Sequence, residues 1–161
     1  MFTKRRDPVK KSIDVVTMGE LLYVLRVPHC GTLERSRTLE CLCGGAEGNV
    51  VVGLSRLGLK TAYMSKVLDN FIGRTLVDDL RSHWVDTQGI LFCREGRMGI
   101  LFIELGTPPR PNLNVYDREG ASILCLLPDE CDWNLFRLAR HFYFSGITAA
   151  LNENCRRVLE R

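Results

Sequence analysis

The residues best suited to bind a small polar molecule begin with a glycine-rich segment in the first third of the chain. Gly44 and Gly45 open the run Gly-Gly-Ala-Glu-Gly-Asn, which ends at Asn49 and leads into an apolar stretch. Small residues let the backbone approach a ligand because no Cβ intervenes. A loop of this kind that enters a helix presents N–H groups to polar ligands. An isolated glycine pair, however, more often marks only a tight turn between a strand and a helix.

Two further segments carry side chains that could contact the same ligand. Glu20 follows Gly19 at the end of an expected strand, and ligands of open α/β sheets bind beyond the carboxyl ends of the strands. A surface carboxylate in a turn explains Glu20 equally well. Tyr116 and Arg118 could clamp a carboxylate or hydroxyl, since a guanidinium offers forked donors. From the residues alone, a surface ion-pair cluster with the neighbouring acids is the better explanation of Arg118.

Several common kinds of site are disfavoured by spacing. No Lys-Ser or Lys-Thr pair follows the glycines as a phosphate-binding loop requires, and Ala46 breaks the GxGxxG fingerprint of a dinucleotide-binding oxidoreductase. Cys41 and Cys43 have neither zinc-finger spacing nor a nearby histidine partner. His29 stands alone and is assigned no role. We therefore predict no metal site and expect the seven cysteines to be reduced thiols.

Size and charge indicate one ordinary globular domain. The chain has 161 residues, of which 45% are hydrophobic and 25% charged. The net charge of +3 is too small to indicate nucleic-acid binding, and no apolar run approaches the ~18 residues that span a membrane. No signal peptide is recognisable, so we expect a cytoplasmic protein. Residues 1–11 are basic and polar and are expected to be disordered.

Hydrophobic patterns predict alternating strands and helices in the first half and a β-rich region in the second. Val51, Val52, Leu54 and Leu57 are spaced for one buried face of a helix that ends at Gly58. The expected strands are 13–16, 21–27, 61–67 and 141–147, with helices over 72–82, 135–138 and 148–161. The segments 90–94, 98–105 and 113–116 predict a small sheet separate from the main one. Val158 and Leu159 have no predicted packing partner.

The segment 43–74 resembles a known family signature. GGAEGN, the following helix, LGLK, a strand ending in SKVLDN, and FIGR together resemble the N-terminal signature of the ribokinase-like (PfkB) sugar kinases. The resemblance extends over 12–161. It implies a three-layer α/β fold with a mostly parallel sheet, here its N-terminal half only, and a small β lid from about 21–42 and 90–118. In the family this lid covers the sugar and often forms a dimer contact, which implies a homodimer.

A second resemblance concerns the substrate. The stretch RMGILFIELGTPPRPNLNVYDREGAS is similar to the matching region of 2-keto-3-deoxygluconate kinases, in which a Tyr-x-Arg pair holds an acidic sugar. A second aromatic hydroxyl of that subfamily is absent, because Ile100, Leu101 and Phe102 follow Gly99. The resemblance implies a substrate pocket lined by Glu20, Gly44, Gly45, Asn49, Tyr116 and Arg118.

The resemblance also implies what this chain lacks. Family members are roughly twice this length, and their other half carries a catalytic Asp in a GAGD-like motif and most of the ATP pocket. No GAGD occurs here. We therefore expect a parent kinase that uses ATP and Mg²⁺, and a chain that has no catalytic residue and binds neither tightly. Three hypotheses follow: an N-terminal piece of a kinase, a non-catalytic sugar-binding or dimerising regulatory module, or one half of a split enzyme.

Overall fold

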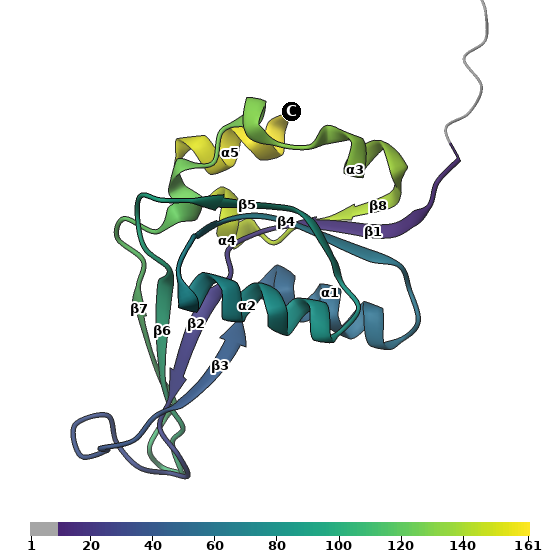
Figure 1. Ribbon diagram of the computed structural model, residues 1–161. Coiled ribbons are helices and arrows are strands. Elements are labelled where there is room, and N and C mark those ends of the chain that lie inside the picture. The colour runs from purple at the N-terminus through teal and green to yellow at the C-terminus, as the bar shows by residue number, and fades with distance from the viewer. Residues whose placement is uncertain (1–9) are drawn as a thin grey trace, which may run out of the picture.

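The chain forms two four-stranded β-sheets with helices on both faces of the first (Figure 1). The computed structural model describes residues 10–161, so most of the segment predicted to be disordered lies outside the described residues. The main sheet is entirely parallel, in the order β5-β4-β1-β8. Its strands are β1 (Ile13–Met18), β4 (Thr61–Leu68), β5 (Asp86–Cys93) and β8 (Ala139–Tyr143).

Helices cover both faces of the main sheet because its central strands are apolar on both sides. Tyr63 and Val67 of β4 pack against one layer, formed by α1 (Ala46–Arg56) and α2 (Phe71–Ser82). Met64 points to the opposite layer, as expected from the two-residue period of a strand. This opposite layer contains η1 (Ser122–Cys125), η2 (Pro128–Glu130), α3 (Trp133–Leu138), α4 (Gly146–Ala149) and α5 (Glu153–Glu160). The predicted α/β class and three-layer arrangement are confirmed.

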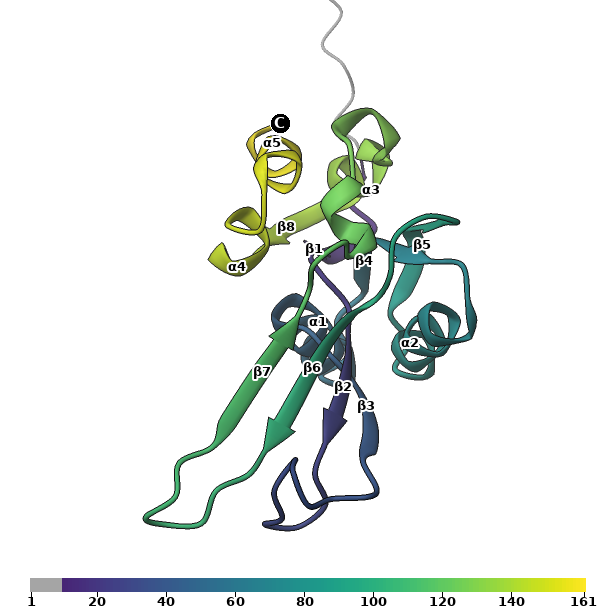
Figure 2. The same cartoon turned by 90° about the vertical axis from the view of Figure 1, so that its left-hand side faces the viewer.

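The second sheet has the order β3-β2-β6-β7 and extends away from the main body (Figure 2). Its strands are β2 (Leu22–Arg26), β3 (Glu40–Gly44), β6 (Gly99–Glu104) and β7 (Leu113–Asp117). Strands β2 and β6 are parallel, while the outer pairs are antiparallel. The prediction that 90–94 belongs to this small sheet is wrong. Those residues end β5 of the main sheet, where Ile90 joins the core beneath α2.

The glycine-rich segment is not a loop. Gly44 ends β3 and α1 begins at Ala46, so Gly45 alone makes the turn, with a φ of 134° that favours glycine. The predicted glycine at the end of α1 is confirmed by Gly58, whose φ is 89°. The prediction that Leu57 is buried is wrong, since it is 80% exposed. Helix α1 ends at Arg56, so Leu57 no longer follows the buried face.

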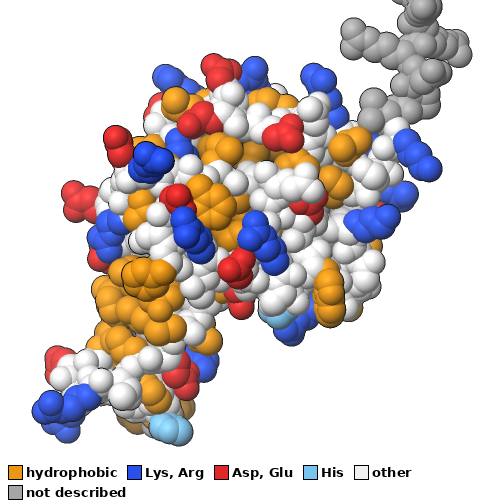
Figure 3. Space-filling model, viewed as in Figure 1, with side chains coloured by type: hydrophobic (Ala, Val, Ile, Leu, Met, Phe, Trp, Pro, Cys, Tyr) orange, Lys and Arg blue, Asp and Glu red, His pale blue; other side chains and the backbone are white. Residues whose placement is uncertain are grey.

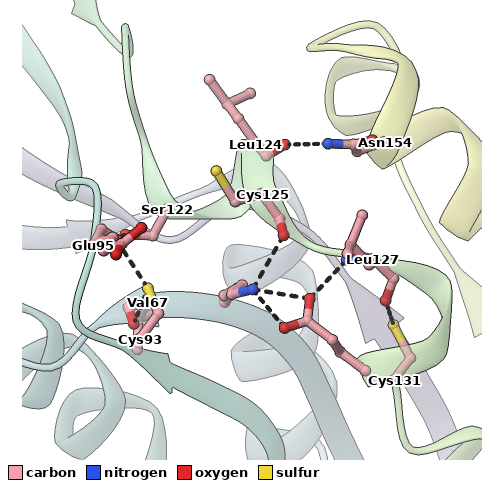
Figure 4. A network of polar contacts seen from close by, with 11 residues as sticks. Val67, Cys93, Glu95, Ser122, Leu124, Cys125, Leu127, Cys131 and Asn154 are labelled. Carbon is pink, nitrogen blue, oxygen red and sulfur yellow. Dashed lines mark hydrogen bonds and ion pairs between the residues drawn. The ribbon is translucent and has the colours of Figure 1, made fainter.

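A polar network holds the C-terminal third to the main sheet (Figure 4). Asp132 caps α3 and Asn152 caps α5. Lys66 of β4 donates hydrogen bonds to the Cys125 carbonyl and to both carboxylate oxygens of Glu130, at 2.7–3.1 Å. These contacts fix η1 and η2 over β4.

Two predictions for this region need correction. The last strand was expected over 141–147, but β8 begins at Ala139 and ends at Tyr143, because Ser145 caps the short helix α4. Val158 was expected to lack a partner, yet it is buried against the Met18 side of the main sheet. Its position on the buried face of α5 required the sheet to be placed first.

Candidate functional site

A pocket of about 210 Å³ lies where the carboxyl end of β1 meets the second sheet. This is the end of a parallel sheet at which α/β proteins bind ligands. Its polar lining comes from four separate parts of the chain, and its apolar lining comes mainly from β2, β6 and α4. The lining residues are Glu20, Leu22, Gly45, Ala46, Glu47, Asn49, Leu101, Tyr116, Arg118, Ile147 and Thr148.

Glu20 supplies a buried carboxyl group to this pocket. It connects β1 to β2, and its side chain is 5% exposed. Nε of Arg118 lies 3.1 Å from Oε2 of Glu20, which makes an ion pair, but the two groups do not meet in hydrogen-bond geometry. Neither Glu20 oxygen has a hydrogen-bond partner among residues 10–161. Buried polar atoms are nearly always hydrogen-bonded, so this carboxylate is suited to accept hydroxyl donors from a ligand.

Burial changes the protonation of Glu20. Loss of hydration raises the pKa of Glu20 from 4.5 to about 7, and Arg118 only partly opposes this by lowering it. The negative charge of Glu47 raises the same pKa a little further. Near neutral pH, the carboxyl group therefore exists in both forms, and each form can exchange hydrogen bonds with a hydroxyl group.

Tyr116 and Arg118 form a preorganised unit at the end of β7. The guanidinium carbon of Arg118 lies 4.1 Å from the centroid of the Tyr116 ring, a distance typical of a cation–π contact. Glu20 holds one edge of the same guanidinium. With the ring on one side and the carboxylate on another, the guanidinium is oriented before any ligand arrives, which favours planar, two-pronged binding of an oxyanion.

Glu47 joins the first turn of α1 to the segment after β8. Its Oε1 accepts hydrogen bonds from the Ser145 N–H at 3.0 Å, the Ser145 hydroxyl at 2.6 Å and the Thr148 hydroxyl at 3.0 Å. A Cβ atom at Gly19 would collide with this carboxylate. Glycine at position 19 therefore leaves the space that the Glu47 side chain occupies. Glu47 therefore holds α1 and the segment after β8 together at the pocket wall.

The structure brings together five of the six residues predicted from the sequence. Glu20, Gly45, Asn49, Tyr116 and Arg118 line one pocket. Gly44 does not line it. A Cβ at Gly44 would meet the side chain of Val24, so this glycine serves close packing between β2 and β3.

Glu47 and Thr148 were missed as site residues. Their signals were an acid inside the glycine-rich run and a hydroxyl residue just beyond a strand. Neither signal says which way a side chain points.

The described residues offer no metal site. Within residues 10–161 there is no group of three or more His, Cys, Asp or Glu side chains that could hold an ion. The same part of the chain has no helix with the length and apolar character needed to cross a membrane. All seven cysteines are free thiols.

The parallel sheet, with a buried carboxylate and an oriented guanidinium beyond its strand ends, defines an α/β protein whose candidate site suits a small polar ligand. Residues 12–161 match the pfkB family of carbohydrate kinases. The chain belongs to this family.

Individual relatives agree with this assignment. The chain is 39% identical to 2-dehydro-3-deoxygalactonokinase of Haloferax volcanii, over 89% of this chain and 45% of that protein. It is 37% identical to probable fructokinase-7 of Arabidopsis thaliana, over 88% of this chain and 41% of that protein. The crystal structure of 2-dehydro-3-deoxygluconokinase from Thermotoga maritima superimposes with a TM-score of 0.88 and 34% identity, over 92% of this chain and 45% of that one.

An uncharacterized sugar kinase from Pyrococcus horikoshii, solved in complex with ATP, superimposes with a TM-score of 0.82 and 30% identity, over 90% of this chain and 47% of that one. The chain thus spans about half the length of the relatives it matches.

Proposed function

We propose that this chain supplies the substrate-binding part of an ATP-dependent kinase for a sugar or sugar acid similar to 2-keto-3-deoxygluconate. The observation that carries the proposal is the buried Glu20 carboxylate, without a hydrogen-bond partner among residues 10–161, beside the guanidinium of Arg118. A sugar acid offers the two complementary groups: hydroxyl donors for Glu20 and a carboxylate for Arg118. The names of two similar proteins, which concern deoxy-keto sugar acids, support this substrate class.

We further propose that phosphoryl transfer needs residues outside this chain. The reaction requires a group that positions the attacking hydroxyl, donors for the transferred phosphate and a metal-bound nucleotide. ATP with Mg²⁺ would act in the longer parent protein and supply the phosphoryl group. The free thiols support a reducing compartment such as the cytoplasm.

Calorimetric titration tests whether this chain binds the sugar but not the nucleotide. The 161-residue chain is titrated with 2-keto-3-deoxygluconate and, separately, with Mg-ATP. We expect saturable sugar binding without nucleotide binding. Tight binding of Mg-ATP would contradict the proposal, because it would place a nucleotide site in this half. Binding of neither ligand by a folded sample would mean that this half does not form a working pocket by itself.

Replacing Arg118 with alanine is expected to weaken binding of the acidic sugar by about 10- to 100-fold, the range of a lost charge-assisted hydrogen bond. The affinity is measured by calorimetry in the longest form of the protein that binds the sugar. Arg26→Ala is the matched control, since Arg26 also pairs with a glutamate on the second sheet but does not line the pocket. An unchanged affinity in Arg118→Ala would disprove the clamp.

We also propose that two copies associate through the second sheet. Strand registers place Tyr23, Ile100 and Asp117 in one row and Leu25, Phe102 and Val115 in the next, on the same face. Leu113 and Val115 on this face are both more than 40% exposed. Figure 3 shows hydrophobic side chains gathered over this sheet. A contiguous exposed apolar patch of this kind typically marks an association surface.

Replacing Phe102 with aspartate is expected to convert a dimer into a monomer, because the new carboxylate would be buried without a partner at the interface. Sedimentation velocity of the wild type and the variant provides the measurement. Phe92→Asp, at an exposed position of the main sheet, serves as the control and should remain dimeric. A wild type that sediments as a monomer at all concentrations would refute this surface.

A second candidate function is that of a module completed by another chain, as in a split enzyme or a regulatory protein. It is favoured by β8, an edge strand of the main sheet that carries exposed Phe142 and is followed directly by exposed Phe144. An unpaired strand edge with apolar side chains is a template for strand addition. Co-purification of a second polypeptide with a GAGD-type sequence would support the split enzyme, whereas sugar binding by the isolated chain with no such partner would favour the regulatory module.

A further inference from the structure

A second pocket, of about 510 Å³, lies at the opposite end of the main sheet. It is formed where β1, β4 and β5 begin, at the right-hand side of Figure 1, between the turn that joins α2 to β5 and helix α3. Thr61, its contact on β4, is the first residue of that strand. None of the residues of the first pocket lines it. It is therefore a separate site, and nothing in the proposed kinase chemistry uses it.

Trp84 lies on the wall of this pocket in an unusual backbone conformation. It is 78% exposed and has a φ of 60°, a region that a bulky residue rarely adopts. Helices α1 and α2 end with the same pattern of backbone hydrogen bonds. The N–H groups of Gly58 and Trp84 each donate to the carbonyl three residues earlier. The N–H of the residue that follows each of them donates to the carbonyl five residues before itself. Glycine fills this place after α1, as is usual. The tryptophan after α2 is therefore explained neither by the turn nor by the core.

Thr61 provides an independent sign of a ligand. Thr61 is one of the residues that line the pocket and is 3% exposed, and its hydroxyl has no hydrogen-bond partner among residues 10–161. A buried hydroxyl without a partner is unfavourable. A ligand with hydroxyl groups would supply the missing hydrogen bond.

The remaining lining selects the chemical class of that ligand. Asp86 and Asp132 each use one carboxylate oxygen to accept a nearby backbone N–H, which fixes the side chain and leaves the other oxygen for a ligand. Gln88 and Asn134 add planar amides, and among residues 10–161 Lys60 is the only lysine or arginine that lines the pocket. The lining formed by these described residues has two aspartates against one lysine, a charge of −1, which disfavours phosphates and other anions.

We propose that this pocket binds an uncharged cyclic polyol, a mono- or disaccharide, with the C–H face of its ring against the Trp84 indole. The carboxylates and amides around the ring accept and donate hydrogen bonds to adjacent hydroxyl groups, and the indole offers a flat apolar surface. Thr61 pairs with a hydroxyl at the inner end. The proposal is independent of the kinase function.

Nuclear magnetic resonance of the ¹⁵N-labelled chain tests this site directly. The chain has two tryptophans, so the indole N–H signal that disappears in Trp84→Gly belongs to Trp84. Maltose and methyl β-D-glucopyranoside are titrated into the millimolar range. We expect a saturable shift of the Trp84 indole and the Gln88 amide, while the Trp133 indole stays in place. Trp84→Gly should fold at least as stably as the wild type, because glycine accepts a positive φ, and should lose about tenfold or more in affinity.

Two further variants separate the outcomes. Thr61→Val keeps the side-chain shape, retains the Trp84 signal and should weaken binding about tenfold. Arg118→Ala alters the first pocket only and should leave the Trp84 titration unchanged. If neither saccharide shifts the Trp84 indole, or if Trp84→Gly and Thr61→Val bind as tightly as the wild type, the site does not exist as proposed.

Discussion

Replacing Gly45 with alanine is expected to lower the free energy of unfolding by about 3 kcal/mol or more. Two effects add at this position. Its φ of 134° lies in a region open essentially to glycine alone. A Cβ atom there would also collide with the backbone carbonyl of Glu20, and backbone cannot move aside as a flexible side chain can. Relief of this collision would move the Glu20 backbone and with it the Glu20 side chain, so ligand affinity should fall together with stability.

Gly53→Ala is the matched control for Gly45→Ala. Gly53 lies inside the same helix, and a Cβ there would meet nothing within 4 Å. Alanine should therefore raise the free energy of unfolding by about 0.5–1 kcal/mol, the usual gain in a helix interior. Urea denaturation of the two variants provides the comparison. Equal effects of the two substitutions would show that Gly45 is not under the steric constraint described.

Replacing Glu20 with glutamine is expected to remove most of the pH dependence of stability between about pH 4.5 and 7. The pKa of Glu20 rises from 4.5 in the unfolded chain to about 7 in the folded one, mainly through burial. The folded state therefore holds a proton that the unfolded state has released, and stability falls as the pH rises through this interval. The full loss amounts to about 3 kcal/mol and levels off above pH 7.

Urea denaturation at a series of pH values measures this slope. Glutamine is neutral at every pH in this range. The variant should therefore be more stable than the wild type at pH 8, and its free energy of unfolding should change less with pH. Glu40→Gln is the control, because Glu40 is an exposed carboxylate paired with Arg26. Its profile should follow the wild type. A slope that persists in Glu20→Gln would assign the pH dependence to another group.

The predicted secondary structure was most reliable where the local signal was strong. The strand over 61–67 and the glycine at the end of α1 were predicted and confirmed. These features depend on backbone conformation and on contacts within a few residues, which neighbouring side chains largely determine. Residues 90–94 were assigned to the wrong sheet for the opposite reason, since a short apolar run is compatible with any strand.

The candidate site likewise combines features that the local sequence predicts with features that only the tertiary structure decides. Sequence alone identified Glu20, Asn49 and Arg118 as polar residues at strand ends or beside a helix start, and the family signature linked them to one pocket. Only the tertiary structure decided that Arg118 pairs with Glu20 rather than with its acidic neighbours, and that Glu47 joins α1 to the segment after β8.

Side-chain direction and burial depend on residues far apart in the chain, so no local pattern contains them. Glu47 and Ser145, for example, are hydrogen-bonded although they lie 98 positions apart in the chain. The chain's own sequence determined its family, its element order and most of the residues that line the candidate pocket. The fold alone decided which of those residues are buried, which lose their hydration, and hence which can change charge near neutral pH.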